Sequence, residues 1–240
     1  MPWSSTSVVL CASHVITKFG SKGWEFATPL LLLHFSPDGG LIAPTLFGLV
    51  VFVLKFLFGP MVGLWMDQTQ RLRVIRTGVA LQTAGVFAAL AVYALLCSLQ
   101  SSGGLAPSLL WALIGLMIVC GVIEALGALI SSVAVKRDWV PTIWTAEDPE
   151  LSSINAAMSN IDLGAEILGP LTAGAALQLL GDELGFVVIG AANIASFGVE
   201  FLLLLRVYKA QASLSAPKPP PKEDGKKGGL LAAWPIFVAQ

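Results

Sequence analysis

Six long apolar stretches occupy most of the chain between residues 7 and 207, and each continues for about 20 residues or more. A stretch of that length matches the hydrocarbon core of a bilayer, where no water can bond the backbone. The stretches are too long and too continuous for the alternating ten-residue strands of a membrane barrel, so we expect helices. The predicted spans are 7–35, 41–66, 73–97, 106–135, 152–181 and 184–207.

The composition points the same way and excludes several classes of protein. Hydrophobic residues make up 55% of the chain and charged residues 12%, and the mean hydropathy is +0.79. The three cysteines show no C-x-x-C spacing, so we expect neither a disulfide framework nor a zinc site. No nucleophile–base pair or cofactor loop stands out among the motifs. We therefore expect a multi-pass membrane protein that is not an enzyme and has no cofactor and no nucleic-acid partner.

The basic residues gather on one side of the predicted bundle. By the positive-inside rule that side is cytoplasmic, and an even number of spans places both termini there. Which membrane the protein occupies stays open between plasma membrane, vacuole and plastid envelope. The eleven of fourteen basic residues on this side are Arg71, Arg73, Arg76, Lys136, Arg137, Arg206, Lys209, Lys218, Lys222, Lys226 and Lys227.

The chain divides into three predicted parts. Residues 1–210 form a six-helix transmembrane lobe, and 211–228, rich in proline and charge, form a disordered cytoplasmic linker. Residues 229–240 turn apolar again and are expected to begin a truncated seventh helix, with a terminal amphipathic peptide as the alternative. Six helices, a polar loop and the start of more are what the N-terminal half of a twelve-helix carrier would look like, an all-α membrane fold.

A charged motif, G-x-x-x-D-x-x-x-R, joins the second and third spans and contains Gly63, Asp67 and Arg71. It resembles the loop of major facilitator carriers in which an acid and an arginine hold helix ends together. A charge-assisted Asp67–Arg71 pair that forms and breaks as the lobe moves would act as a gate. The alternative is a solvated loop whose charges only follow topology.

Ionisable residues inside the spans are costly in lipid unless they are paired or face water. Gly20 and Gly23 lie among the charged residues of the first span, and Gly169-Pro170 follows the charged residues of the fifth span. We therefore expect both helices to be broken at these points. The charged positions are Lys18, Lys22, Glu25, Lys55, Glu124, Asp162, Glu166 and Glu200.

Asp162, Glu166 and Asn155 share one face of the fifth span, because they are separated by four and seven residues. Oxygen ligands from spans one and five would suit a divalent metal, or a proton relay if no metal binds. The competing interpretation is structural neutralisation, in which Lys22 or Lys55 pairs with Glu124 or Glu200.

Four segments together resemble the ferroportins, the iron exporters of solute carrier family 40. They lie in the same order across residues 8–207, and the R-D-W triplet and the N-A-x-x-x-x-I-D run are the most specific. The segments are Ala12 to Ala27, Gly63 to Arg71, Val135 to Val140, and Asn155-Ala156 with Ile161-Asp162 and Gly169-Pro170.

The resemblance implies a major facilitator type fold of two six-helix lobes around a central cavity, of which this chain would be the N-terminal lobe. It also implies export of ferrous iron or related divalent metals by alternating access. The family's metal site in this lobe draws on an acid that maps to Ser21 and on a side chain that maps to Glu25. Because Ser21 is not an acid, Glu25 is expected to supply the carboxylate, which resembles the plant and plastid branch. By the same resemblance, Asp162 and Asn155 would help to bind the metal. Four further residues would form the cytoplasmic gate: Asp67, Arg71, Arg137 and Asp138.

We therefore predict a ferroportin-like exporter in which Glu25 and Asp162 hold Fe²⁺, with Asn155 as helper. Its partners would be the bilayer, the metal ion, and a missing C-terminal lobe in the same or a partner chain. One alternative is a carrier of another cation or a metal chelate. The other is a non-transporting membrane half-protein that serves as a scaffold.

Overall fold

The structure, a computed structural model, describes residues 3–36, 39–101 and 105–218. Its described part contains six long helices, which correspond to the six predicted spans. Two short elements follow the fourth long helix and one follows the last. The elements are α1 (Ser5–Phe35), α2 (Ile42–Gln68), α3 (Arg71–Ser101), α4 (Pro107–Val133), the π turn η2 (Ala134–Trp139), α5 (Val140–Ile143), α6 (Pro149–Leu180), α7 (Asp182–Ala210) and α8 (Ala212–Ser215).

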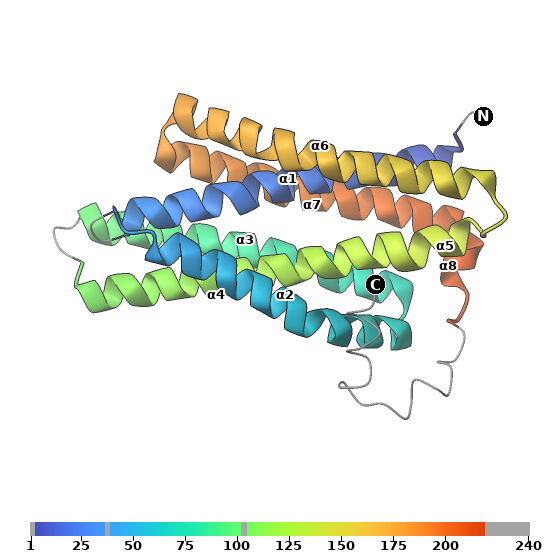
Figure 1. Cartoon of the computed structure of the whole chain (residues 1–240), viewed down its shortest axis with the longest axis horizontal. Coiled ribbons are helices and arrows are strands. Elements are labelled where there is room, and N and C mark those ends of the chain that lie inside the picture. Colours follow the sequence, from blue (N-terminus) through green and yellow to red (C-terminus); the bar gives the residue numbers. More distant parts are fainter. Residues whose placement is uncertain (1–2, 37–38, 102–104, 219–240) are drawn as a thin grey trace.

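The long helices lie side by side along one axis and alternate in direction, so consecutive helices are antiparallel (Figure 1). One end of the bundle holds the starts of α1, α3 and α6 together with α5 and α8. At the opposite end Gly181, with φ +80°, joins α6 to α7 in a single tight turn that favours glycine. This up-and-down order brings helices one and six, which are distant in sequence, into parallel contact.

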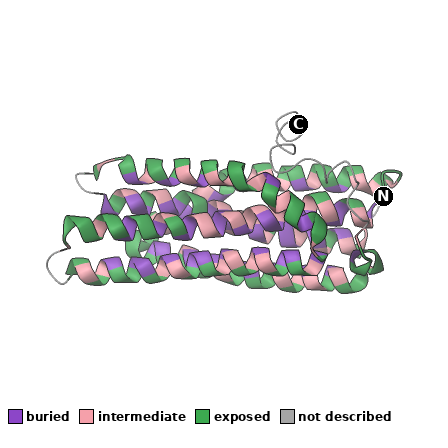
Figure 2. Ribbon diagram, turned by 90° about the horizontal axis from the view of Figure 1, so that it is seen from below, coloured by how far each residue is buried: buried purple, intermediate pink, exposed green. Residues whose placement is uncertain are grey.

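Among the described residues, five helical segments are long and apolar enough to cross a membrane: α2, α3, Pro107–Ile143, α6 and α7. The sixth long helix, α1, is 31 residues long but carries Lys18, Lys22 and Glu25 in its middle. Buried residues gather on the sides of the helices that face one another, and exposed residues gather on the outer sides (Figure 2). Many of the outward side chains are large and apolar, as expected where the solvent is lipid.

The interior has two hydrophobic centres. One contains Trp24, Phe186 and Tyr93, whose rings pack with centroids 4.8 Å (Trp24–Phe186) and 5.1 Å (Tyr93–Phe186) apart. The other lies nearer the end that carries α5 and is built around Trp139 and Ile75. The polar cavity described below lies along α1 between them.

Glycines allow close contact between the backbones of α3 and α4. A Cβ atom placed on Gly85 would lie 2.6 Å from the Glu124 nitrogen, and one on Gly127 would lie 2.6 Å from the Gln82 nitrogen. Small residues at such contacts let helix backbones approach closely in a membrane. Both neighbours are backbone atoms, so the space cannot be made by a side-chain rotation.

The prediction that α1 and α6 are broken helices is wrong, because both are continuous across the glycines in question. Gly20 instead faces Asn193 of α7, whose Oδ1 would lie 2.6 Å from an added Cβ. Gly169 faces α1, where the Lys22 Cβ would lie 2.6 Å from an added Cβ and the Gly23 nitrogen 3.1 Å. These glycines serve helix packing, and the backbone hydrogen bonds do not need to open.

A π turn, Ala134–Trp139, continues α4 toward α5 and contains the predicted Arg137-Asp138 pair. Such turns hold one extra residue per turn and often occur at functional sites. Here the turn directs Lys136 toward α6 and Asp138 toward α3, while Trp139 is fully buried.

The predicted linker, residues 211–228, is described only as far as Lys218. In that part it includes α8 and reaches back to the bundle, where Lys218 Nζ donates to the Met66 carbonyl at 2.7 Å. The remaining predicted linker residues and the predicted seventh helix, 229–240, lie outside the described residues.

Candidate functional site

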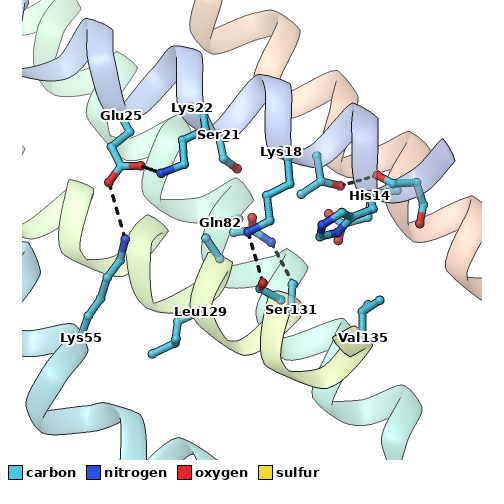
Figure 3. Close-up of a pocket in the computed structure, with 15 residues that line it drawn as sticks. His14, Lys18, Ser21, Lys22, Glu25, Lys55, Gln82, Leu129, Ser131 and Val135 are labelled. Carbon is cyan, nitrogen blue, oxygen red and sulfur yellow. Dashed lines mark hydrogen bonds and ion pairs between the residues drawn. The ribbon is translucent and has the colours of Figure 1, made fainter. Parts of the chain in front are cut away.

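A polar cavity of about 180 Å³ lies along α1 and is also lined by residues of α2, α3, α4 and α7. Figure 3 shows the charged side chains of α1 extending across it. Positions 14, 18, 22 and 25 recur every three or four residues and so fall on one helix face, with position 21 beside them. The polar side chains that line it are Ser13, His14, Thr17, Lys18, Ser21, Lys22 and Glu25 of α1, Lys55 of α2, Gln82 of α3, Ser131 and Ser132 of α4, and Glu200 of α7.

Glu25 is held by two lysines. Lys22 Nζ donates to its Oε2 at 2.8 Å, and Lys55 Nζ lies 3.8 Å from its Oε1 (Figure 3). The same Lys22 ammonium is 2.6 Å from Glu166 Oε1 on α6. One ammonium therefore bridges carboxylates on two helices, while a second reaches Glu25 from a third helix.

Asp162 of α6 forms a separate cluster. His14 Nε2 is 2.9 Å from Asp162 Oδ1, and Lys18 Nζ is 3.8 Å from the same oxygen. Lys136, directed by the π turn, pairs with Asp162 Oδ2. This cluster lies near the end of the bundle that holds the start of α1.

The geometry does not bring Glu25 and Asp162 to one point. Asp162 bonds to His14, and Glu25 is eleven residues further along the same helix, about 16 Å in the axial direction. Asn155 is exposed on α6 and does not line the cavity, whereas Ser21 does. Among the described residues no three His, Cys, Asp or Glu side chains group closely enough to hold a metal by themselves.

The competing interpretation is that lysines neutralise the carboxylates inside the bundle. The structure does contain such lysine–carboxylate pairs. The partners differ, since Lys22 and Lys55 meet Glu25 and Glu166 and not Glu124 or Glu200. Glu124 and Glu200 are instead buried, with 6% and 4% exposure.

Three buried oxygens that line the cavity have no hydrogen-bond partner among the described residues: Ser21 Oγ, Gln82 Oε1 and Glu200 Oε2. A buried acceptor without a donor is costly, so such atoms call for a ligand or a water. Gln82 is fully buried, and its amide nitrogen donates to Ser131 Oγ at 3.0 Å, which leaves Oε1 as the unpaired atom. Sequence reasoning passed over Gln82 because an uncharged residue gives no signal inside an apolar span.

The predicted gate residues lie at the end of the bundle that carries α8. Arg71 Nε donates to Asp138 Oδ1 at 2.8 Å, and Lys218 Nζ lies 2.7 Å from Asp138 Oδ2. Arg71 Nη1 also donates to the Ala216 carbonyl at 3.0 Å. In the part of the chain that the structure describes, the arginine pairs with Asp138 and not with the exposed Asp67, while Arg137 is exposed in the π turn.

Six packed helices around a charged internal cavity, with ion pairs at one end, define one lobe of a major facilitator type membrane transporter. A solved structure supports this assignment, that of a bacterial homologue of iron transporter ferroportin in the outward-facing state with soaked iron. The two match with a TM-score of 0.78 at 30% identity, over 88% of this chain and 51% of that one.

The family follows from the sequence match. Residues 4–228 match the Ferroportin1 family model, so the chain belongs to the ferroportin family of membrane transporters and is not an enzyme.

Two curated relatives show how the chain stands within that family. It is 31% identical over 203 residues to the Ferreportin of Bdellovibrio bacteriovorus, which covers 83% of this chain and 46% of the relative. It is 29% identical over 211 residues to solute carrier family 40 member 1 of rice, with 86% and 43% covered. The chain thus spans about half the length of these relatives, and the identities do not favour the plant branch over the bacterial one.

Proposed function

We propose that this lobe takes part in the export of ferrous iron or a related divalent metal by alternating access. The observation that carries the proposal is the cavity on α1. It is lined by carboxylates and by buried oxygens that have no hydrogen-bond donor among the described residues, inside an otherwise apolar bundle. Hard oxygen ligands are those that divalent cations of this kind accept. Family membership and the iron-soaked bacterial homologue agree with a metal substrate.

Within this proposal Glu25 and Ser21 belong to the cavity position, and Gln82 and Glu200 are further polar residues of the same lining. Asp162 belongs to a second position, one helical turn before Glu166 on α6, where His14 bonds it. The histidine, the carboxylate and two lysines form a polar chain there, which suits a metal step or a proton relay. Asn155 would help only from the exposed face of α6.

The gate assignment is part of the same proposal. Arg71, Asp138 and Lys218 would hold the α8 end closed while the cavity faces the other side. Rocking against a second lobe would break these ion pairs, and that lobe would come from further residues or a partner chain. We place this end, and both termini, on the cytoplasmic side because it carries the excess of basic residues.

The lysines favour a second candidate function, the transport of an anionic metal chelate. Lys18, Lys22 and Lys55 all line the cavity and would attract carboxylates of a chelator. Binding of ferrous citrate that is lost on removal of Lys18 would favour this candidate over free metal.

The test is titration of Co²⁺, a stand-in for Fe²⁺, into the 240-residue chain in detergent. Saturable binding should be lost in Glu25→Gln and weakened in Asp162→Asn. The matched control is Glu183→Gln, an exposed acid in the first turn of α7 at the opposite end of the bundle. Equal binding by all four proteins would refute the proposed ligands.

A further inference from the structure

Lys22 occupies a position that a metal ion could also fill. Its ammonium lies 2.8 Å from Glu25 Oε2 and 2.6 Å from Glu166 Oε1, between carboxylates that two different helices provide. Lys55 lies 3.8 Å from the other oxygen of Glu25. Both oxygens of the cavity carboxylate therefore already face a cation that belongs to the protein.

Packing fixes the Cβ atom of Lys22, whereas its ammonium group is not fixed in this way. Gly169 of α6 leaves room for the Lys22 Cβ, which would lie only 2.6 Å from a Cβ added to that glycine. The α1–α6 contact thus sets where the lysine starts, and the four-carbon stem still lets the ammonium move. The side chain is 24% exposed, which is consistent with a tip that can leave.

The same cavity contains acceptors that lack a donor. Ser21 Oγ, Gln82 Oε1 and Glu200 Oε2 are buried, and no described residue donates to them. Lys22 lines the same cavity, so these oxygens are the acceptors that the structure offers to an ammonium displaced from the Glu25–Glu166 position. The residual cost of its displacement would then be small compared with leaving it unpaired.

We propose that Lys22 is a tethered cation that holds the Glu25–Glu166 position in the empty protein, and that a divalent metal binds there by displacing it. The metal takes one oxygen ligand from α1 and one from α6, and the released ammonium moves into the cavity. Lys22 is a specificity-determining residue in this scheme, because a monovalent ion cannot compete with a tethered ammonium as a divalent one can. The inference rests on the proposed function, since it takes a divalent metal as the substrate.

The experiment compares Co²⁺ binding to the 240-residue chain and its variants in detergent. Lys22→Gln should bind Co²⁺ at least about ten-fold more tightly than the unmodified chain, since the competing charge is gone. Lys22→Arg keeps the charge and should show no gain. The double variant Lys22→Gln/Glu166→Gln should lose the gain, because it lacks one of the two ligands.

Two further variants separate this role from a structural one. Lys209→Gln, an exposed lysine in the last turn of α7, should leave the affinity unchanged. Lys55→Gln should tighten binding less than Lys22→Gln, because Lys55 is further from the carboxylate, and it provides the test if Lys22→Gln does not fold. A lysine that only holds helices together would lower thermal stability without raising metal affinity.

The outcomes distinguish the two proposals. If Co²⁺ binding is lost in Glu25→Gln but neither lysine variant binds more tightly, the proposed function stands and the tethered-cation role is overturned. If no protein in the series binds Co²⁺, both are overturned. Tighter binding in Lys22→Gln that persists in the double variant would show that Glu166 is not a ligand and would also overturn the site.

Discussion

Substitution of Gly85 by alanine tests whether α3 and α4 depend on backbone contact. The added Cβ would lie 2.6 Å from the Glu124 nitrogen, 2.8 Å from the Cys120 carbonyl oxygen and 2.9 Å from the Glu124 Cα. Carbon atoms in favourable contact are about 3.5–4.0 Å apart, so the helices would have to separate by roughly 1 Å. Overpacking of this kind costs about 1–3 kcal/mol.

The matched control is Gly115→Ala on α4, where an added Cβ meets nothing within 4 Å. Alanine at an open helical position is about 1 kcal/mol more favourable than glycine. The same preference applies to Gly85→Ala, so the two single-methyl variants should differ by the overpacking cost alone, with Gly85→Ala less stable than Gly115→Ala by about 1–3 kcal/mol.

Reversible unfolding in one detergent, followed by circular dichroism against denaturant, measures this difference. Gly127→Ala should behave like Gly85→Ala, because its neighbours are also backbone atoms, the Gln82 nitrogen and the Gly78 oxygen. Equal stability of Gly85→Ala and Gly115→Ala would refute the close backbone contact between the two helices.

Two further predictions concern polar contacts at the α8 end. Asp138→Asn should lower the free energy of unfolding by about 3 kcal/mol, because Arg71 and Lys218 both lose their carboxylate; unchanged stability in the same unfolding assay would contradict the ion-pair geometry. Glu150→Gln should speed hydrogen exchange in the first turn of α1, because the carboxylate accepts from the Ser4 amide at 2.9 Å and from Trp144 Nε1 at 3.0 Å, and an amide cannot accept on both sides. Mass spectrometry of deuterium uptake measures this, and identical uptake in both proteins would show that Glu150 does not hold that turn.

The apolar runs were enough to predict the long helices because a membrane span has few alternatives. The second span, predicted at 41–66, is Ile42–Gln68, and the fifth, predicted at 152–181, is Pro149–Leu180. The glycine pairs misled the prediction, since glycine at a helix contact and glycine at a helix break look alike in one sequence. Only the facing helix decides between them, as Gly169 shows by packing on Lys22.

The charged residues of the site were identifiable, but their partners were not. An ionisable residue in an apolar run is visible at once, whereas its partner depends on how two helices are rotated about their axes. Lys22 therefore bridges Glu25 and Glu166, although the sequence alone permitted Glu124 or Glu200. Uncharged members such as Gln82 carry no such signal and emerge only from burial and an unmet hydrogen bond.

The π turn at Ala134–Trp139 makes the end of α4 a separately adjustable segment. If the same residues were wound as a regular α-helix, everything beyond the turn would rotate by about 100°, because the wide turn now absorbs one extra residue. Asp138 would then turn away from Arg71, while the glycine contact between α3 and α4 on the other side of the turn would keep its register. The extra residue in the turn thus sets the rotation of the Asp138 ion pair about the helix axis separately from that of the α3–α4 packing. Either one can change without the other.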